Sequence, residues 1–117
     1  MLGMHGTYEA NMAMNECDLM INIGARFDDR ITGKIDEFSP NSKKIHIDID
    51  PSSINKIVKV DVPLIGDVAH VLEDSIKLWK SKVYKINKPP LKEWWKTIDK
   101  WKEKDSLKYA SDKNTIK

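Results

Sequence analysis

The chain has 117 residues, of which 40% are hydrophobic, and its formal net charge is +2. This charge is too small for the strong field that binding to nucleic acid or to an anionic membrane requires. A single cysteine, Cys17, excludes an intrachain disulfide, and neither a signal peptide nor an apolar run of about 18 residues is visible. We therefore expect a protein of a reducing compartment, with neither nucleic acid nor membrane among its partners.

The first part of the chain predicts a helix followed by a strand. Thr7 suits a helix N-cap, and apolar residues recur at helical spacing over residues 8–17. Cys17 at the end of this helix is expected to be a buried, inert thiol. Residues 18–24 are mostly apolar and end at Gly24, which is typical of a buried parallel strand.

The middle of the chain predicts a loop and a second strand. Residues 26–40 are polar, and we expect a functional loop with one helical turn there. Residues 43–50 alternate isoleucine with polar residues, as in a strand. Asp50 should cap a short helix over residues 51–55, which begins with proline. Residues 58–65 are β-prone, and Gly66 ends that run.

The last part predicts two amphipathic helices separated by a linker. Asp67 should cap a helix whose apolar positions Val68, Val71, Leu72, Ile76 and Trp79 follow the helical period. Residues 85–90 contain two prolines and predict a stiff linker, and residues 91–104 predict a helix with a tryptophan stripe suited to docking. Helices between parallel strands predict an α/β fold with a parallel sheet. With two good strands visible, we interpret the chain as a fragment of a larger protein.

Two places in this pattern suit an anionic ligand. A glycine turn opens the first helix, whose N-terminus could face an anion. Arg26, Asp28, Asp29 and Arg30 follow the first strand, where ligands of open parallel sheets bind. The sequence favours two interpretations about equally. These side chains bind a ligand, or they form salt bridges with one another in a surface turn.

Other polar residues are weaker candidates. Asp48 and Asp50 share one face of the second strand, where a carboxylate could accept from ribose or ribityl hydroxyls, or could face solvent and cap the next helix. His46 on that face is interpreted as a polar face residue rather than a ligand. The histidines show no metal-binding spacing, and no Walker A, G-x-G-x-x-G or G-x-S-x-G motif is present.

Several blocks of the sequence resemble the catalytic subunits of the acetolactate synthase (acetohydroxyacid synthase) family of thiamine-diphosphate enzymes. The blocks are LGMHGT from Leu2, GARFDDRITG from Gly24, HIDIDP from His46 and GDV from Gly66. The second block is highly specific, whereas HIDIDP is shared with other thiamine-diphosphate enzymes. The similarity extends over essentially the whole chain, including the helix that begins at Leu91.

The resemblance implies a place for this chain in a larger subunit. Residues 1–84 would be the C-terminal part of the central FAD-binding domain, part of a Rossmann-like parallel sheet. Residues 85–117 would be a helical linker that leads to a missing thiamine-diphosphate-binding domain. By resemblance, the FAD contacts would be Leu2, Gly3, Met4, His5, Gly24, Ala25, Arg26, Asp28, Arg30, Asp48, Ile49, Asp67 and Val68. Arg30, with Asp29 beside it, would hold the carboxylate of the acceptor 2-keto acid.

The reaction implied by the resemblance condenses two pyruvates, or pyruvate and 2-ketobutyrate, with loss of CO2. The products, 2-acetolactate or 2-aceto-2-hydroxybutyrate, lead to branched-chain amino acids. FAD would have a structural role, and Mg2+ would accompany thiamine diphosphate. The catalytic glutamate and the metal motif belong to domains absent here, so we expect no catalytic or metal-binding residue in this chain and no activity of this chain alone.

The resemblance also implies partners and a location. The full subunits would form a homo-oligomer, a dimer or tetramer, and a small regulatory subunit would bind them. The location would be the bacterial cytoplasm or a plastid. Two alternatives stay open: another thiamine-diphosphate carboligase, such as glyoxylate carboligase, and a nucleotide-binding module without catalysis.

Overall fold

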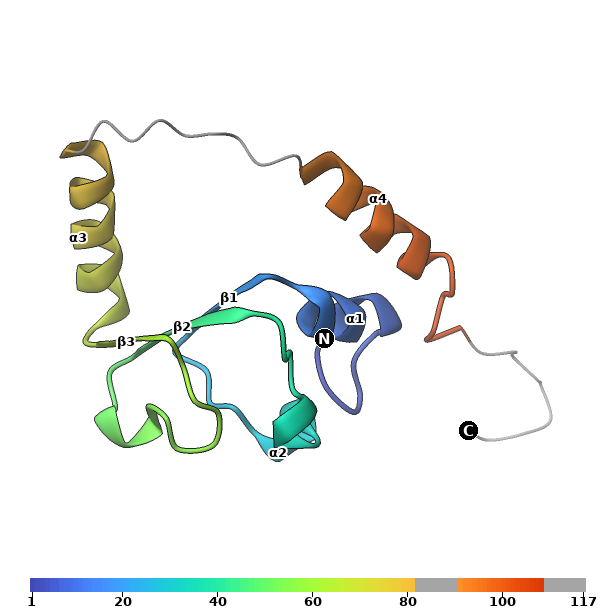
Figure 1. Ribbon diagram of the computed structural model, residues 1–117, viewed down its shortest axis with the longest axis horizontal. Coiled ribbons are helices and arrows are strands. Elements are labelled where there is room, and N and C mark those ends of the chain that lie inside the picture. The colour runs from blue at the N-terminus through green and yellow to red at the C-terminus, as the bar shows by residue number, and fades with distance from the viewer. Residues whose placement is uncertain (82–90, 109–117) are drawn as a thin grey trace.

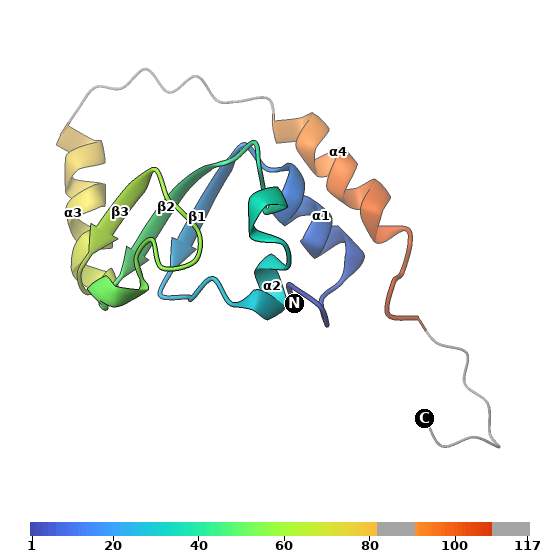
Figure 2. The same ribbon diagram turned by 60° about the horizontal axis from the view of Figure 1, so that its bottom comes forward.

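The computed structural model describes residues 1–81 and 91–108, and it shows an α/β arrangement (Figures 1 and 2). The predicted linker over residues 85–90 and the boundary between residues 84 and 85 lie outside the described residues. The elements in chain order are α1 Tyr8–Glu16, β1 Leu19–Ile23, α2 Asp29–Thr32, η1 Ile35–Glu37, β2 Lys43–Asp48, η2 Pro51–Ser53, β3 Val62–Ile65, α3 Val68–Ser81 and α4 Leu91–Lys102, where η denotes a 3-10 helix.

Among the described residues, three strands form one parallel sheet in the order β1-β2-β3. Ile21 pairs with Ile45, and Ile45 pairs with Val62, so these apolar residues share one face. Lys44, His46 and Asp48 therefore belong to the opposite face. The predicted α/β class with a parallel sheet is confirmed.

The core of the described chain lies against the face that carries His46. Phe27 and Phe38 pack edge to face with ring centroids 5.8 Å apart, and Val58 completes this buried cluster. Met14 of α1 and Met20 of β1 pack against it. Helix α3 contacts β2, and it lies across the sheet from α2 (Figure 1).

Side chains at N-cap positions determine where several elements begin. The Thr7 hydroxyl accepts a hydrogen bond from the Ala10 amide at 3.4 Å, and Asp50 accepts from the Ser52 amide at 2.8 Å. Both predicted caps are confirmed. The loop after β1 has two helical turns, α2 and η1, where one was expected. The last helix ends at Lys102, two residues before its predicted end.

Three expectations about burial and extent were wrong. Strand β1 is not buried within the described residues, because it lies at one edge of the sheet and Leu19, Ile21 and Ile23 are about half exposed. The third strand begins at Val62 instead of Val58, because the Val60 amide donates to the side chain of Asn55 rather than to β2. Cys17 is partly exposed, and its Sγ lies 3.3 Å from the Met14 carbonyl oxygen.

Candidate functional site

The carboxyl ends of the three strands lie side by side and bring several predicted residues together. Gly24 follows β1, and its amide donates to the Ile47 carbonyl at 2.8 Å. Gly66 follows β3, and its amide donates to the Asp48 carbonyl at 3.0 Å. The predicted residues Gly24, Asp48 and Asp67 therefore lie along one edge of the sheet, where ligands of such sheets bind.

The glycine turn before α1 contacts the charged loop directly. The Met4 amide donates to the Arg30 carbonyl at 2.9 Å. The side chain of Asn11 fixes the turn from within α1, since it accepts from the Gly3 amide at 2.7 Å and donates to the Gly3 carbonyl at 2.9 Å. The glycine turn and the charged loop are therefore held next to each other.

The charged loop is ordered by Asp28. Its carboxylate accepts from the Arg30 amide at 3.0 Å and so caps α2. This backbone hydrogen bond, with further help from the Asp29 side chain and the Arg26 and Arg30 guanidiniums, holds the pKa of Asp28 below its usual value. Arg26 lies 3.8 Å from Asp28, but its side chain is 80% exposed. The guanidinium is therefore accessible to a ligand.

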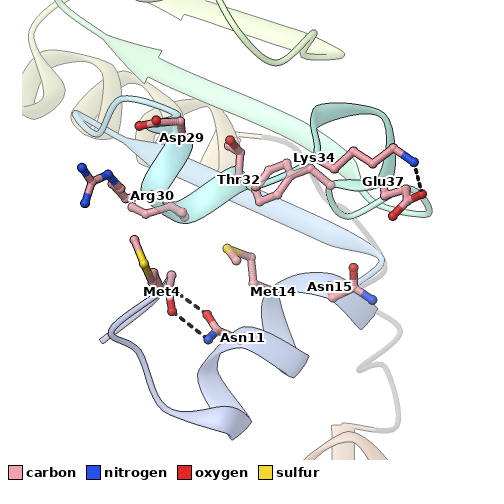
Figure 3. A pocket seen from close by; sticks show the side chains of 13 residues that line it. Met4, Asn11, Met14, Asn15, Asp29, Arg30, Thr32, Lys34 and Glu37 are labelled. Carbon is pink, nitrogen blue, oxygen red and sulfur yellow. Dashed lines mark hydrogen bonds and ion pairs between the residues drawn. The ribbon is translucent and has the colours of Figure 1, made fainter.

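Two of the cavities in the described part of the chain border the loop and contain predicted residues. The first, of about 590 Å³, lies between α1 and the α2–η1 segment (Figure 3). It is lined by the predicted residues Gly3, Met4, Asp29 and Arg30. In Figure 3 the Met14 side chain points from α1 toward α2 across this space. The second cavity, of about 450 Å³, is mostly apolar and is lined by the predicted residues Leu2, Ala25 and Arg26.

The other predicted residues line neither of these cavities. Ile49 is 69% exposed beyond the end of β2, and His5 is exposed in the first turn. The Asp67 carboxylate accepts from the Ala69 amide at 3.0 Å and from the His70 amide at 3.3 Å, which confirms it as the cap of α3. Val68, the first residue of α3, is half-buried.

The polar side chains of β2 are buried, so the solvent-facing alternative does not hold for His46 and Asp48. His46 is completely buried, and Asp48 is 7% exposed. Lys44 is also buried, and its ammonium donates to the Ser39 carbonyl at 2.8 Å and to the Ser42 carbonyl at 3.2 Å. The buried aromatic residues Phe27 and Phe38 cover this face, and that tertiary packing has no signature in the sequence of β2 itself.

Within residues 1–81 and 91–108, no group of at least three His, Cys, Asp or Glu side chains could hold a metal ion. None of the helices in that part of the chain is long and apolar enough to cross a membrane.

Comparisons with known proteins identify the family. Residues 1–74 match the family described as thiamine pyrophosphate enzyme, central domain. Over its full length the chain is 51% identical to the acetolactate synthase large subunit of Buchnera aphidicola from Schizaphis graminum and 43% identical to the acetolactate synthase isozyme 3 large subunit of Escherichia coli. Over 99% of its length it is 43% identical to the acetolactate synthase large subunit of Cyanidium caldarium.

The chain covers 20% of the length of each of these relatives. The family match, by contrast, covers well over half of the chain, and the parallel sheet agrees with it. The chain therefore belongs to the thiamine pyrophosphate enzyme family, and its residues 1–74 belong to the central domain.

Proposed function

We propose that this chain forms part of the FAD site in the large subunit of an acetolactate synthase. The observation that carries the proposal is the 2.9 Å hydrogen bond between the Met4 amide and the Arg30 carbonyl. It joins the glycine turn to the charged loop, and both belong to the blocks that resemble this family. The names of the relatives support the same assignment.

The residues at the carboxyl edge fit a flavin dinucleotide. A Cβ on Gly24 would meet no atom within 4 Å, so this position leaves room for a ligand against the backbone. Arg26 offers an exposed guanidinium to the pyrophosphate, and Asp48 offers an acceptor to a hydroxyl group. The remaining contacts would come from Leu2, Gly3, Met4, His5, Ala25, Asp28, Arg30, Ile49, Asp67 and Val68. FAD would supply a structural element rather than redox chemistry.

Thiamine diphosphate and Mg2+ need residues from outside the described part of this chain. That part offers no metal-binding cluster. In the proposal, the full subunit condenses two pyruvates, or pyruvate and 2-ketobutyrate, and this chain alone is inactive. We also propose that the full subunits form a homo-oligomer and bind a small regulatory subunit. The proposed location is the bacterial cytoplasm or a plastid.

The test of the reaction uses the full polypeptide that the gene encodes, supplied with thiamine diphosphate, Mg2+ and FAD. We expect 2-acetolactate from pyruvate, and 2-aceto-2-hydroxybutyrate when 2-ketobutyrate is added. Condensation of glyoxylate in place of these reactions would instead indicate a different carboligase. Bound FAD without any condensation product would favour a nucleotide-binding module.

Within this proposal, Arg30 holds the carboxylate of the acceptor keto acid, with Asp29 beside it. Both residues line the first cavity, and Arg30 is exposed there. Arg30→Ala should raise the KM for the acceptor at least about tenfold, because a charge-assisted hydrogen bond is lost. Because Arg30 is one of many contacts proposed for FAD, the content of bound FAD should change little. The KM of Arg30→Lys should lie between those of the wild type and Arg30→Ala. Unchanged acceptor kinetics in Arg30→Ala would exclude this role.

A further inference from the structure

The buried histidine of β2 has no part in the function proposed so far. His46 has no exposed surface, and neither of its ring nitrogens has a hydrogen-bond partner among the residues that the structure describes. A buried polar atom without a partner destabilises the folded state, so such a group in a native core calls for an explanation. An apolar side chain would fill the same space without that cost.

The charged group facing His46 is the carboxylate of Asp48, two residues farther along the same face of the strand. Nε2 of His46 lies 3.6 Å from Oδ2 of Asp48. This distance is longer than a hydrogen bond, so donation from Nε2 to Oδ2 requires the two atoms to approach by about half an ångström. The other carboxylate oxygen, Oδ1, already accepts from the Asp50 amide at 2.9 Å. The carboxylate is thus fixed at one oxygen and faces the imidazole with the other.

Neither Phe27 nor Lys44 forms a hydrogen bond with the imidazole of His46. The Phe27 ring packs edge to face on the imidazole, with centroids 5.2 Å apart, and holds its plane. Lys44 lies on the same strand face, but its ammonium is bound to the carbonyls of Ser39 and Ser42. The geometry therefore fixes the imidazole plane beside a carboxylate that is nearly buried.

We propose that His46 is a positioning residue for Asp48. Its Nε2–H donates to Oδ2 and keeps the carboxylate turned toward the carboxyl edge of the sheet, where it accepts from a hydroxyl of the flavin dinucleotide. This inference rests on the proposed function, because it requires Asp48 to meet the flavin. It adds a role for a residue that does not itself touch the ligand.

The test is a double-mutant cycle on FAD affinity in the full polypeptide. Two variants at position 46 are a matched pair: Gln can place an amide donor near the position of Nε2, whereas Asn can reach only the position of Nδ1. His46→Asn and Asp48→Asn should each weaken FAD binding about tenfold, and their combination should be no weaker than Asp48→Asn alone. His46→Gln should bind FAD within about threefold of the wild type.

The outcomes separate this inference from the proposed function. If Asp48→Asn weakens FAD binding and His46→Asn weakens it further by the same factor in that background, His46 acts independently of Asp48 and the inference is overturned. Equal losses in His46→Gln and His46→Asn would also overturn it, because they would indicate packing rather than donation. A wild type that does not bind FAD, or an Asp48→Asn variant that binds it normally, would overturn the proposed role of Asp48 as well.

Discussion

Gly3 occupies a position where an added methyl group would strike the backbone of the charged loop. Its φ is +84°, and a Cβ would lie 2.4 Å from the Arg30 carbonyl oxygen, which accepts from the Met4 amide. Gly33 is a matched comparison, because its φ is +57° but a Cβ there would meet nothing within 4 Å. Both positions have a positive φ, which strains alanine, and Gly3 has the steric contact in addition.

We therefore expect Gly3→Ala to lower the free energy of unfolding by about 1–3 kcal/mol more than Gly33→Ala does. Gly3→Ala should also weaken FAD binding in the full polypeptide, because the turn and the loop can no longer stay in contact. Urea denaturation and flavin titration of the two variants measure these effects. Equal losses of stability in both variants would show that the close contact is not present in solution.

At the scale of single residues, the sequence predicted the interactions between residues that are close to each other in the chain. Asp50 and Asp67 were expected to cap the elements that follow them, and both do so through backbone amides two or three residues ahead. The burial of Lys44 and His46 was missed. Alternation along β2 separates two faces, but it does not say which face the Phe27 and Phe38 side chains will cover.

At the scale of elements, the hydrophobic period and the glycine breaks predicted α1, β1 and β2. The extent of β3 was not predictable from β-propensity. It is set by where the chain turns at Asn55, whose φ is +57° and whose side chain takes the Val60 amide. The cavity between α1 and α2 arises from packing between elements, which no local pattern encodes.

Because Asp28 caps α2, the folding of the charged loop should depend on the ionisation of the Asp28 carboxylate. The pKa of Asp28 is lower in the folded chain than its ordinary value of 3.8, chiefly because of the Arg30 amide. The ionised cap therefore favours the folded loop above pH 3.8, and this contribution is lost as the pH falls through the lowered pKa. Across the range from pH 7 to pH 5 the cap should be fully effective.

Hydrogen exchange of the backbone amides of residues 29–33 measures how stably this loop is folded. Asp28→Ala should expose these amides to several-fold faster exchange, while Asp28→Asn, which keeps an acceptor for the Arg30 amide, should stay near the wild type. Wild-type protection, corrected for intrinsic rates, should be the same at pH 7 and pH 5. Faster exchange in Asp28→Asn than in Asp28→Ala would contradict the capping role.

Helix α4 packs on α1 (Figure 2). Trp94 and Trp101 are half-buried and meet edge to face at 5.8 Å, whereas Trp95 is 56% exposed. At the end of this interface, the Lys104 ammonium lies 3.6 Å above the Tyr8 ring and the Ser106 hydroxyl accepts from the Tyr8 amide at 3.0 Å. The predicted docking role of the tryptophan helix is consistent with these contacts.

Trp101→Ala should therefore release α4 more readily than Trp95→Ala does. Loss of a half-buried indole costs about 1–3 kcal/mol, so amide exchange across α4 should rise about tenfold or more in the full polypeptide. Trp95→Ala should leave the exchange close to that of the wild type. If Trp95→Ala has the larger effect, the opposite face of α4 makes the stabilising contact.

At the scale of the whole molecule, one apolar surface is unexplained by the described residues. Leu19, Ile21 and Ile23 of the edge strand β1 are 50%, 54% and 44% exposed and lie on the face opposite His46. A row of this kind is unusual on an isolated domain, and parallel sheets are normally covered on both faces. Since the relatives are about five times as long, we expect further polypeptide to cover this row.

Substitution by lysine tests whether this row is covered. In the full polypeptide, Ile21→Lys should lower the melting temperature and the soluble yield, because a charge placed in a covered apolar contact is left without a partner. Ile35→Lys is the matched control, since Ile35 is similarly exposed, at 50% against 54% for Ile21, but lies in η1 rather than in the sheet. In the 117-residue chain expressed alone, Ile21→Lys should instead reduce aggregation and the binding of a hydrophobic dye, because there the same side chain faces water. If Ile21→Lys is tolerated in the full polypeptide as well as Ile35→Lys is, the row is exposed to solvent in the complete protein too.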